Sequence, residues 1–431
     1  MFYSVIKKGN AATEGIVTLT VAGSLTAKTC RSRSPIHCCR RACRLFGVPS
    51  VTRIIAIGVS ILCALTLFPG RSLAADSLTQ HLTVKPAIEP GSNVFTNDQE
   101  WDGASSINVF SATDLAYKGN ITTGTMAQML LSPDGKTAYT VSVYMKRISY
   151  GEAEMVLQSF DVATLSLIKE IALPPKFAMI TPYQHLLAQS ADGRYIYVQN
   201  ATPATSVTVV DVAAGKVAGE IPTPGCFGIY PSLQGRKFTV ICGDGTFASY
   251  VLKEDGATAD RTQSKQIFDV DKDPLFLPAQ RASADLIFIS YHGNVYRISD
   301  TGASVRLLET FSVTQGITGG WAPGGYELIA YNKRNDVLFI GMHPDAKDGS
   351  HKQGAQEIWA YGMAKRKLLY RSPVEEVLAM TVSDDAVPVL FAIKEKTVMR
   401  FEVDPDAKFV LKKTGEALNS GPYNLEVEWR P

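Results

Sequence analysis

The sequence predicts an all-β fold, a seven-bladed β-propeller, because it contains a repeated unit of strands and turns with no helix signal. The clearest copy of this unit runs from Ala188 to Ile221. Within it, Tyr195 to Val198 has the β-branched and aromatic composition of a buried strand, and Val207 to Val212 is a second strand. Asp192-Gly193 supplies a tight turn, because glycine readily adopts a positive φ.

The unit recurs along the chain. Ser159 to Ala163 aligns without a gap on Val209 to Ala213, 50 residues later, and Asp134-Gly135 repeats the turn at Asp192-Gly193. Repeats of this length that consist only of strands indicate a propeller with one four-stranded blade per repeat.

Strand and turn signals predict six complete blades, at residues 123–171, 188–221, 229–252, 286–308, 326–370 and 380–411. Two strands precede them, at 106–110 and 115–121, and one follows at 423–429. We expect the two ends to share a closing blade, because closure removes exposed sheet edges. The propeller is therefore assigned to residues 106–431 with seven blades, with six or eight as alternatives. Residues 75–105 are assigned to an N-terminal arm.

Residues 1–74 have the pattern of a leader with a signal peptide. The apolar run from Ile54 to Phe68 follows Arg53 and precedes the small-x-small sequence Ser72-Leu73-Ala74. The run is short for a membrane span, which favours cleavage over an uncleaved anchor. The segment before Arg53 is basic, and its four cysteines match no zinc-site spacing. An early start codon is the simpler interpretation of that segment.

Removal of the leader changes both the charge and the cysteine count. Residues 75–431 carry 33 basic and 40 acidic residues, a formal charge of −7, which argues against nucleic acid as a partner. Only Cys226 and Cys242 remain, at the start and end of a strand–turn–strand segment. An exported chain with two cysteines favours one disulfide, and two free buried thiols are the alternative.

No catalytic constellation stands out in the sequence. His343, Asp345, Asp348 and His351 share one loop, but their spacing matches no metal site and two lysines lie among them, so a polar insertion at an interface is favoured. The alternating acids from Asp269 to Asp273 lack the glycine and the glutamate of a calcium loop. There is no phosphate loop, nucleophile elbow or dinucleotide fingerprint.

Several longer stretches resemble the heavy subunit of quinoprotein amine dehydrogenases, and the aralkylamine branch more closely than the methylamine branch. The resemblance covers about Asn120 to Trp429. The stretches that carry it most clearly are Gln199–Ser206, Gly225–Gly245, Ser290–Tyr296, Trp321–Tyr326 and Met342–Trp359.

This resemblance implies a periplasmic propeller that assembles as two heavy and two small light chains. The light chain carries tryptophan tryptophylquinone, so neither a cofactor nor a catalytic residue is expected on this chain. A primary amine is oxidised to an aldehyde and ammonia, and a blue copper protein, azurin or amicyanin, accepts the electrons. The resemblance also implies a disulfide between Cys226 and Cys242. The rival hypothesis is a periplasmic propeller that only binds a partner, and methylamine is the alternative substrate.

One position departs from the family pattern. Family members place a phenylalanine at the wall of the substrate channel where this chain has Thr125, with Met126 beside it. We therefore assign Thr125, Met126 and Gln128 to the channel wall by hypothesis. We assign His343, Asp345 and His351 to the light-chain interface on the same basis.

Overall fold

The computed structural model describes residues 85–147, 150–419, 421 and 423–431. The predicted leader at 1–74 and residues 75–84 of the predicted arm lie outside the described residues. In the described part, the only helices are two single 3-10 turns, η1 (Gln184–Leu186) and η2 (Ser350–Lys352). No described helix has the length and apolar character needed to cross a membrane.

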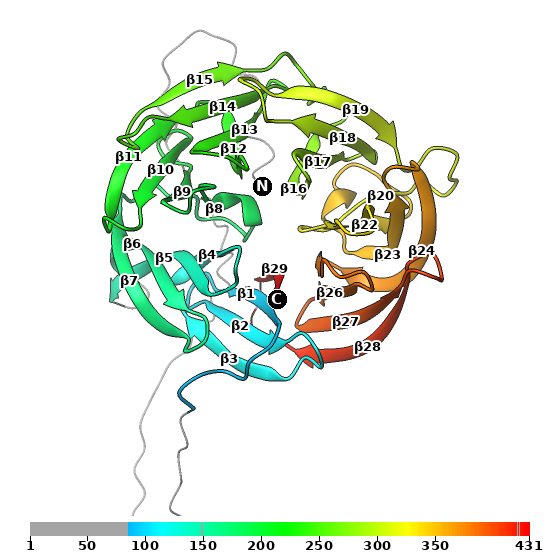
Figure 1. Cartoon of the computed structure of the whole chain (residues 1–431), viewed down its shortest axis with the longest axis horizontal. Coiled ribbons are helices and arrows are strands. Elements are labelled where there is room, and N and C mark those ends of the chain that lie inside the picture. Colours follow the sequence, from blue (N-terminus) through cyan, green and yellow to red (C-terminus); the bar gives the residue numbers. More distant parts are fainter. Residues whose placement is uncertain (1–84, 148–149, 420, 422) are drawn as a thin grey trace, which may run out of the picture. The chain divides into compact units, whose positions relative to one another are not determined.

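The strands form seven antiparallel sheets arranged around a ring, so the predicted seven-bladed β-propeller is confirmed (Figure 1). We number the blades along the chain and give their strands from the innermost outward. Blade 1 holds β29 (Tyr423–Arg430), β1 (Asn93–Gln99), β2 (Ser106–Ser111) and β3 (Tyr117–Thr122). Blade 2 holds β4 (Thr125–Leu131), β5 (Thr137–Arg147), β6 (Tyr150–Asp161) and β7 (Ser166–Leu173). Blade 3 holds β8 (Leu187–Gln189), β9 (Tyr195–Asn200), β10 (Ser206–Asp211) and β11 (Lys216–Pro222).

The remaining blades follow the same pattern. Blade 4 holds β12 (Cys226–Pro231), β13 (Lys237–Cys242), β14 (Phe247–Leu252) and β15 (Ala259–Gln263). Blade 5 holds β16 (Leu275–Ala282), β17 (Asp285–Ser290), β18 (Asn294–Ser299) and β19 (Arg306–Ser312). Blade 6 holds β20 (Ala322–Pro323) and β21 (Ile329–Asn332), which both pair with β22 (Val337–His343), then β23 (Ala355–Gly362) and β24 (Lys367–Val377). Blade 7 holds β25 (Ala379–Val382), β26 (Val389–Lys394), β27 (Thr397–Asp404) and β28 (Val410–Leu418).

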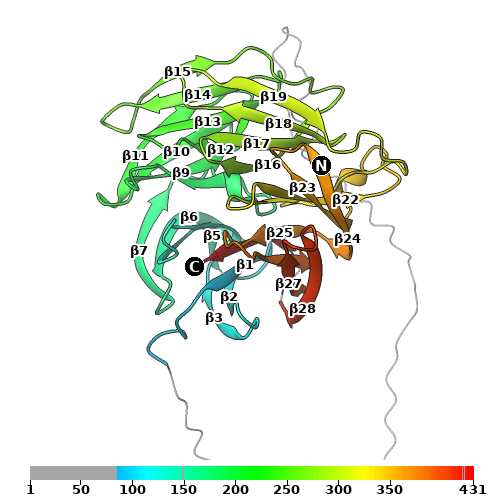
Figure 2. The same cartoon turned by 45° about the vertical axis from the view of Figure 1, so that its right-hand side comes forward.

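Blade 1 closes the ring with both ends of the chain, as predicted. The C-terminal strand β29 pairs antiparallel with β1, from Asn93 opposite Arg430 to Gln99 opposite Tyr423. The two strands lie side by side in both views (Figure 1 and Figure 2). This pairing covers the sheet edges that an open ring would expose.

The assignment of residues 75–105 to an arm was wrong for Asn93–Gln99. The sequence of this segment, NVFTNDQ, is mostly polar, yet all seven residues are buried in β1. Burial is possible because polar side chains of β1 find partners on β29 and at Asn419, which directly follows β28. The Thr96 hydroxyl donates to Asn419 Oδ1 at 3.1 Å, and the Asn97 amide donates to Glu426 at 2.9 Å. The propeller therefore starts at Asn93, not at Ser106.

Seven hydrophobic clusters hold the blades together, and each one lies between two neighbouring blades. The cluster around Phe95 and Met129 joins blades 1 and 2, and the cluster around Val427 and Phe391 joins blades 1 and 7. The other five clusters join the remaining neighbours in turn around the ring. Because the central strands of a blade are covered on both faces, several of them, such as β9 and β17, contain continuous apolar runs.

Candidate functional site

The innermost strands all begin on one side of the ring, which we call the start face. It carries the loops at 100–105, 123–126, 177–186 and 344–354 and the start of β12. The residues that the sequence assigned to a channel wall and to a light-chain interface all belong to this face or to the strand ends directly behind it.

The segment at residues 177–186, which we call the axial segment, crosses the start face at the ring axis. The Ile180 carbonyl accepts hydrogen bonds from the Gln99 and Gln128 side chains, both at 3.0 Å. The Tyr183 amide donates to Gln128 Oε1 at 3.2 Å. Three hydrogen bonds therefore fasten this blade 3 segment, two of them to β4, the innermost strand of blade 2, and one to β1.

The rest of the axial segment reaches the opposite side of the ring. The Gln184 amide donates to Glu327 in blade 6 at 3.0 Å. His185 accepts a hydrogen bond from the Ala279 amide of blade 5 at 2.9 Å and packs on Tyr230 of blade 4 at 4.6 Å. Burial lowers the pKa of His185 to about 4, so its imidazole is neutral and serves as an acceptor. Nothing in the sequence signals this segment, because its partners come from five other blades.

Three buried glutamates lie near the axial segment: Glu426 and Glu428 on β29, and Glu327 just before β21. Burial raises the pKa of Glu327 to about 8, and the charge of Glu428 adds to the shift. Burial also raises the pKa of Glu426 and of Glu428, which pairs with Arg430. A buried carboxylate loses the solvation that water gives its charged form, and this explains why all three pKa values are raised. Because all three side chains are buried, they support the start face from inside and cannot contact a partner.

The predicted channel-wall residues occupy two different positions. Thr125 and Met126 are half-buried at the start of β4, where both donate to the Glu100 carbonyl, from the Thr125 hydroxyl at 2.8 Å and from the Met126 amide at 2.7 Å. Gln128 is only 1% exposed, and both ends of its amide hold the axial segment. Gln128 therefore does not line the start face itself. It positions the backbone of the axial segment, which does.

The predicted interface residues also differ in their access to a partner. His343 is 1% exposed, and its Nδ1 donates to the Pro344 carbonyl at 3.0 Å, so it shapes the loop from inside. Asp345 is exposed. His351 is half-buried and stacks on Tyr291 at 4.5 Å, and burial lowers its pKa. Asp345 is therefore the member of this group that is most open to a partner.

An aromatic patch on the start face has no signal in the sequence. Trp101 is 43% exposed and stacks on Tyr423 with ring centroids 4.9 Å apart. Tyr183 and Tyr326 lie with ring centroids 6.0 Å apart, and Met179 in the axial segment is also exposed. Large apolar side chains grouped on one face commonly mark a binding surface.

The predicted disulfide between Cys226 and Cys242 is confirmed. The two residues are directly opposite each other in β12 and β13, and the sulfur atoms are bonded. Both belong to the hydrophobic cluster between blades 3 and 4. The bond therefore fastens the start of the innermost strand of blade 4 at the start face.

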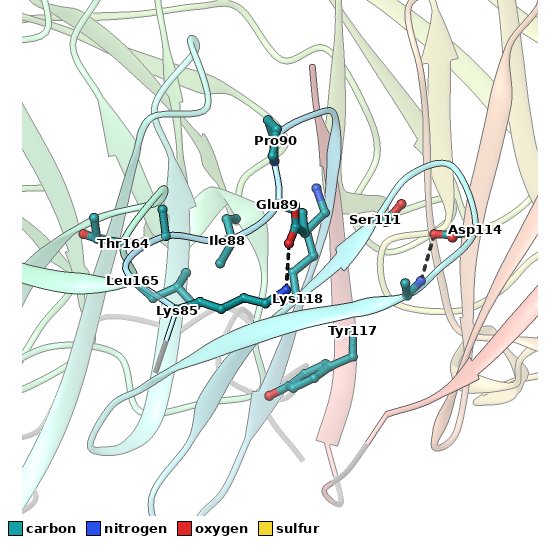
Figure 3. Close-up of a pocket in the computed structure, with 12 residues that line it drawn as sticks. Lys85, Ile88, Glu89, Pro90, Ser111, Asp114, Tyr117, Lys118, Thr164 and Leu165 are labelled. Atoms are coloured by element: carbon teal, nitrogen blue, oxygen red, sulfur yellow. Dashed lines mark hydrogen bonds and ion pairs between the residues drawn. The ribbon is translucent and has the colours of Figure 1, made fainter. Parts of the chain in front are cut away.

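A cavity of about 510 Å³ lies away from this region, next to residues 85–90 (Figure 3). Its walls come from the turn between β2 and β3 and the turn between β6 and β7, on the side of the ring opposite the start face. Lys85 and Glu89 form an exposed ion pair at its edge. Among the described residues, no group of three or more histidine, cysteine, aspartate or glutamate side chains has the arrangement of a metal site.

Comparison with known proteins places this chain among amine dehydrogenase subunits. Residues 94–421 match the methylamine dehydrogenase heavy chain (MADH) family. The heavy chain of Methylobacillus flagellatus methylamine dehydrogenase is 24% identical over 381 residues, which cover 83% of this chain and 92% of that one. The corresponding chain of Methylorubrum extorquens is 24% identical over 362 residues, with 81% and 86% covered.

Solved structures show the same fold in proteins of other function. A Bacteroides fragilis protein described as a candidate 6-phosphogluconolactonase superposes with a TM-score of 0.55 at 12% identity, covering 80% of this chain and 100% of that chain. This likeness concerns the propeller fold alone. The family match covers most of the chain and includes strands of all seven blades, and the chain therefore belongs to the methylamine dehydrogenase heavy chain family.

Proposed function

We propose that this chain is the heavy subunit of a periplasmic amine dehydrogenase that converts a primary amine and water into an aldehyde and ammonia. Two electrons leave the amine in this reaction and pass to an acceptor protein. The observation that carries the proposal is the family match over residues 94–421. The relatives that match are named as heavy chains of methylamine dehydrogenases.

The redox chemistry in this proposal is supplied by tryptophan tryptophylquinone on a small light chain, with two heavy and two light chains in the complex. The contribution of this chain is a rigid docking surface. The start face suits that role because the axial segment is fastened to five other blades. A blue copper protein, azurin or amicyanin, is the proposed electron acceptor.

The periplasmic location is proposed on two features. The leader at 1–74 has the pattern of a signal peptide. The Cys226–Cys242 disulfide supports an oxidising compartment, since such bonds persist outside the cytosol.

Two classes of primary amine remain in competition for the substrate. The names of the curated relatives favour methylamine, at identities of 22–25%. The sequence stretches described above resemble the aralkylamine branch instead. The proposed activity is tested by purifying the chain with its light chain and measuring amine-dependent reduction of a redox dye. A chain that binds no light chain and supports no amine oxidation would favour the rival function, a propeller that only binds a partner.

Thr125→Phe is expected to change the order of preference among amines while leaving assembly with the light chain intact. Thr125 is half-buried at the start of β4, and a phenyl ring there adds bulk to the proposed channel wall. The measurement is kcat/KM for a panel of short and aromatic amines, with the light-chain affinity as the control. Unchanged relative specificity across the panel contradicts the assignment of Thr125 to the channel.

A further inference from the structure

The loop at residues 100–105 is clamped onto the start of β4. The Glu100 carbonyl accepts hydrogen bonds from the Thr125 hydroxyl and the Met126 amide, at 2.8 and 2.7 Å. Ser105 pairs with the backbone on the other side of the clamp: its carbonyl accepts from the Thr123 amide at 2.9 Å, and its amide donates to the Gly124 carbonyl at 3.2 Å. The loop therefore has a fixed position next to Thr125.

This loop presents Trp101 in a single, supported orientation. The indole nitrogen donates to Gln99 Oε1 at 2.8 Å, and one face of the ring stacks on Tyr423. Gln99 is itself buried and is held by the carbonyls of Ala127 and Ile180. Because the indole N–H of Trp101 is already hydrogen-bonded to Gln99, the exposed part of the ring offers only an apolar, π-rich surface.

The other three tryptophans are placed differently. Trp359 is fully buried, and Trp321 and Trp429 are half-buried. Trp101 is the tryptophan of the chain that leaves a large part of its ring open. An ordered aromatic ring that stays exposed is suited to binding, since it loses little conformational entropy when a ligand stacks on it.

We propose that Trp101 is a specificity-determining residue that forms the aromatic wall of the substrate channel beside Thr125 and favours aryl-substituted primary amines over methylamine. This inference rests on the proposed function. Thr125 has a small side chain, and its hydroxyl is hydrogen-bonded to the carbonyl of Glu100, the residue directly before Trp101. An aryl amine can stack on that indole, whereas methylamine has no ring and gains nothing from it.

The test uses the complex of heavy and light chains and three variants. Trp101→Ala removes the ring, Trp101→Phe keeps an aromatic face, and Tyr117→Ala is a matched control, because Tyr117 is 58% exposed on the outermost strand β3. For each complex, kcat and KM are measured with 2-phenylethylamine and with methylamine, and the affinity for the light chain is measured by biolayer interferometry.

The expected result is a loss of roughly ten- to hundredfold in kcat/KM for 2-phenylethylamine in Trp101→Ala, mostly through KM. Methylamine oxidation and light-chain affinity stay unchanged, Trp101→Phe recovers most of the loss, and Tyr117→Ala behaves as the wild type. Equal losses for both amines together with weaker light-chain binding overturn the inference and make Trp101 a docking anchor. Unchanged kinetics in Trp101→Ala also overturn it. A wild-type complex that oxidises no amine contradicts the proposed function itself.

Discussion

Glu327→Gln is expected to remove much of the loss of stability that the propeller suffers as the pH rises from about 5 to about 8. Burial raises the pKa of Glu327 from 4.5 to about 8. The folded state therefore binds a proton in this pH range that the unfolded state releases. Stability is full below pH 4.5 and falls as the pH rises through the folded pKa. The size of this contribution is on the order of 3–5 kcal/mol between the two limits.

Glutamine suits the test because it keeps the acceptor for the Gln184 amide and cannot ionise. Glu426 and Glu428 have raised pKa values of the same origin, so part of the pH dependence remains in the variant. The measurement is the free energy of unfolding in guanidinium chloride at several pH values. Exposed Glu152→Gln is the control and is expected to keep the wild-type slope. Parallel pH profiles for Glu327→Gln and the wild type contradict the account.

The Cys226→Ala, Cys242→Ala double variant is expected to lose about 3 kcal/mol of stability, because the bond closes a loop of 16 residues that the unfolded chain otherwise leaves free. Both cysteines belong to the cluster between blades 3 and 4, so the loss of their sulfur atoms adds a smaller packing term.

The effect should be measured as the shift of the guanidinium unfolding midpoint at constant slope. Wild-type protein unfolded and refolded under reductant is the matched control, and its stability is expected to approach that of the double variant. A loss of stability below about 1 kcal/mol would contradict the prediction, because it would mean that the disulfide contributes little to the stability of blade 4.

Local chemistry in the sequence was sufficient to predict the blades. Strands such as Tyr195–Asn200 combine β-branched and aromatic residues with Asp-Gly turns, and these signals act over a few residues. The strand β1 was missed because its burial depends on partners more than 300 positions away, such as Asn419 and Glu426. A polar segment of this kind has no local signal that separates it from a solvated arm.

In the candidate site too, features with a local sequence signal were predicted and features that depend on distant contacts were missed. The family resemblance selected Thr125, and the polar character of its insertion selected the loop with Asp345. The fold places both on the start face. Neither signal selected Trp101, because the exposure of its ring depends on a clamp between two blades. The axial segment was also missed, since the contact of Gln128 with Ile180 spans 52 residues and that of Gln184 with Glu327 spans 143.

The central claim is that this propeller works as the heavy subunit of a quinone-containing amine dehydrogenase. The most direct test is a native purification of the chain from its own host, followed by a visible spectrum and a titration with phenylhydrazine. The account predicts a small co-purifying subunit and a quinone absorption band that phenylhydrazine bleaches or shifts. A colourless propeller that purifies alone would contradict it.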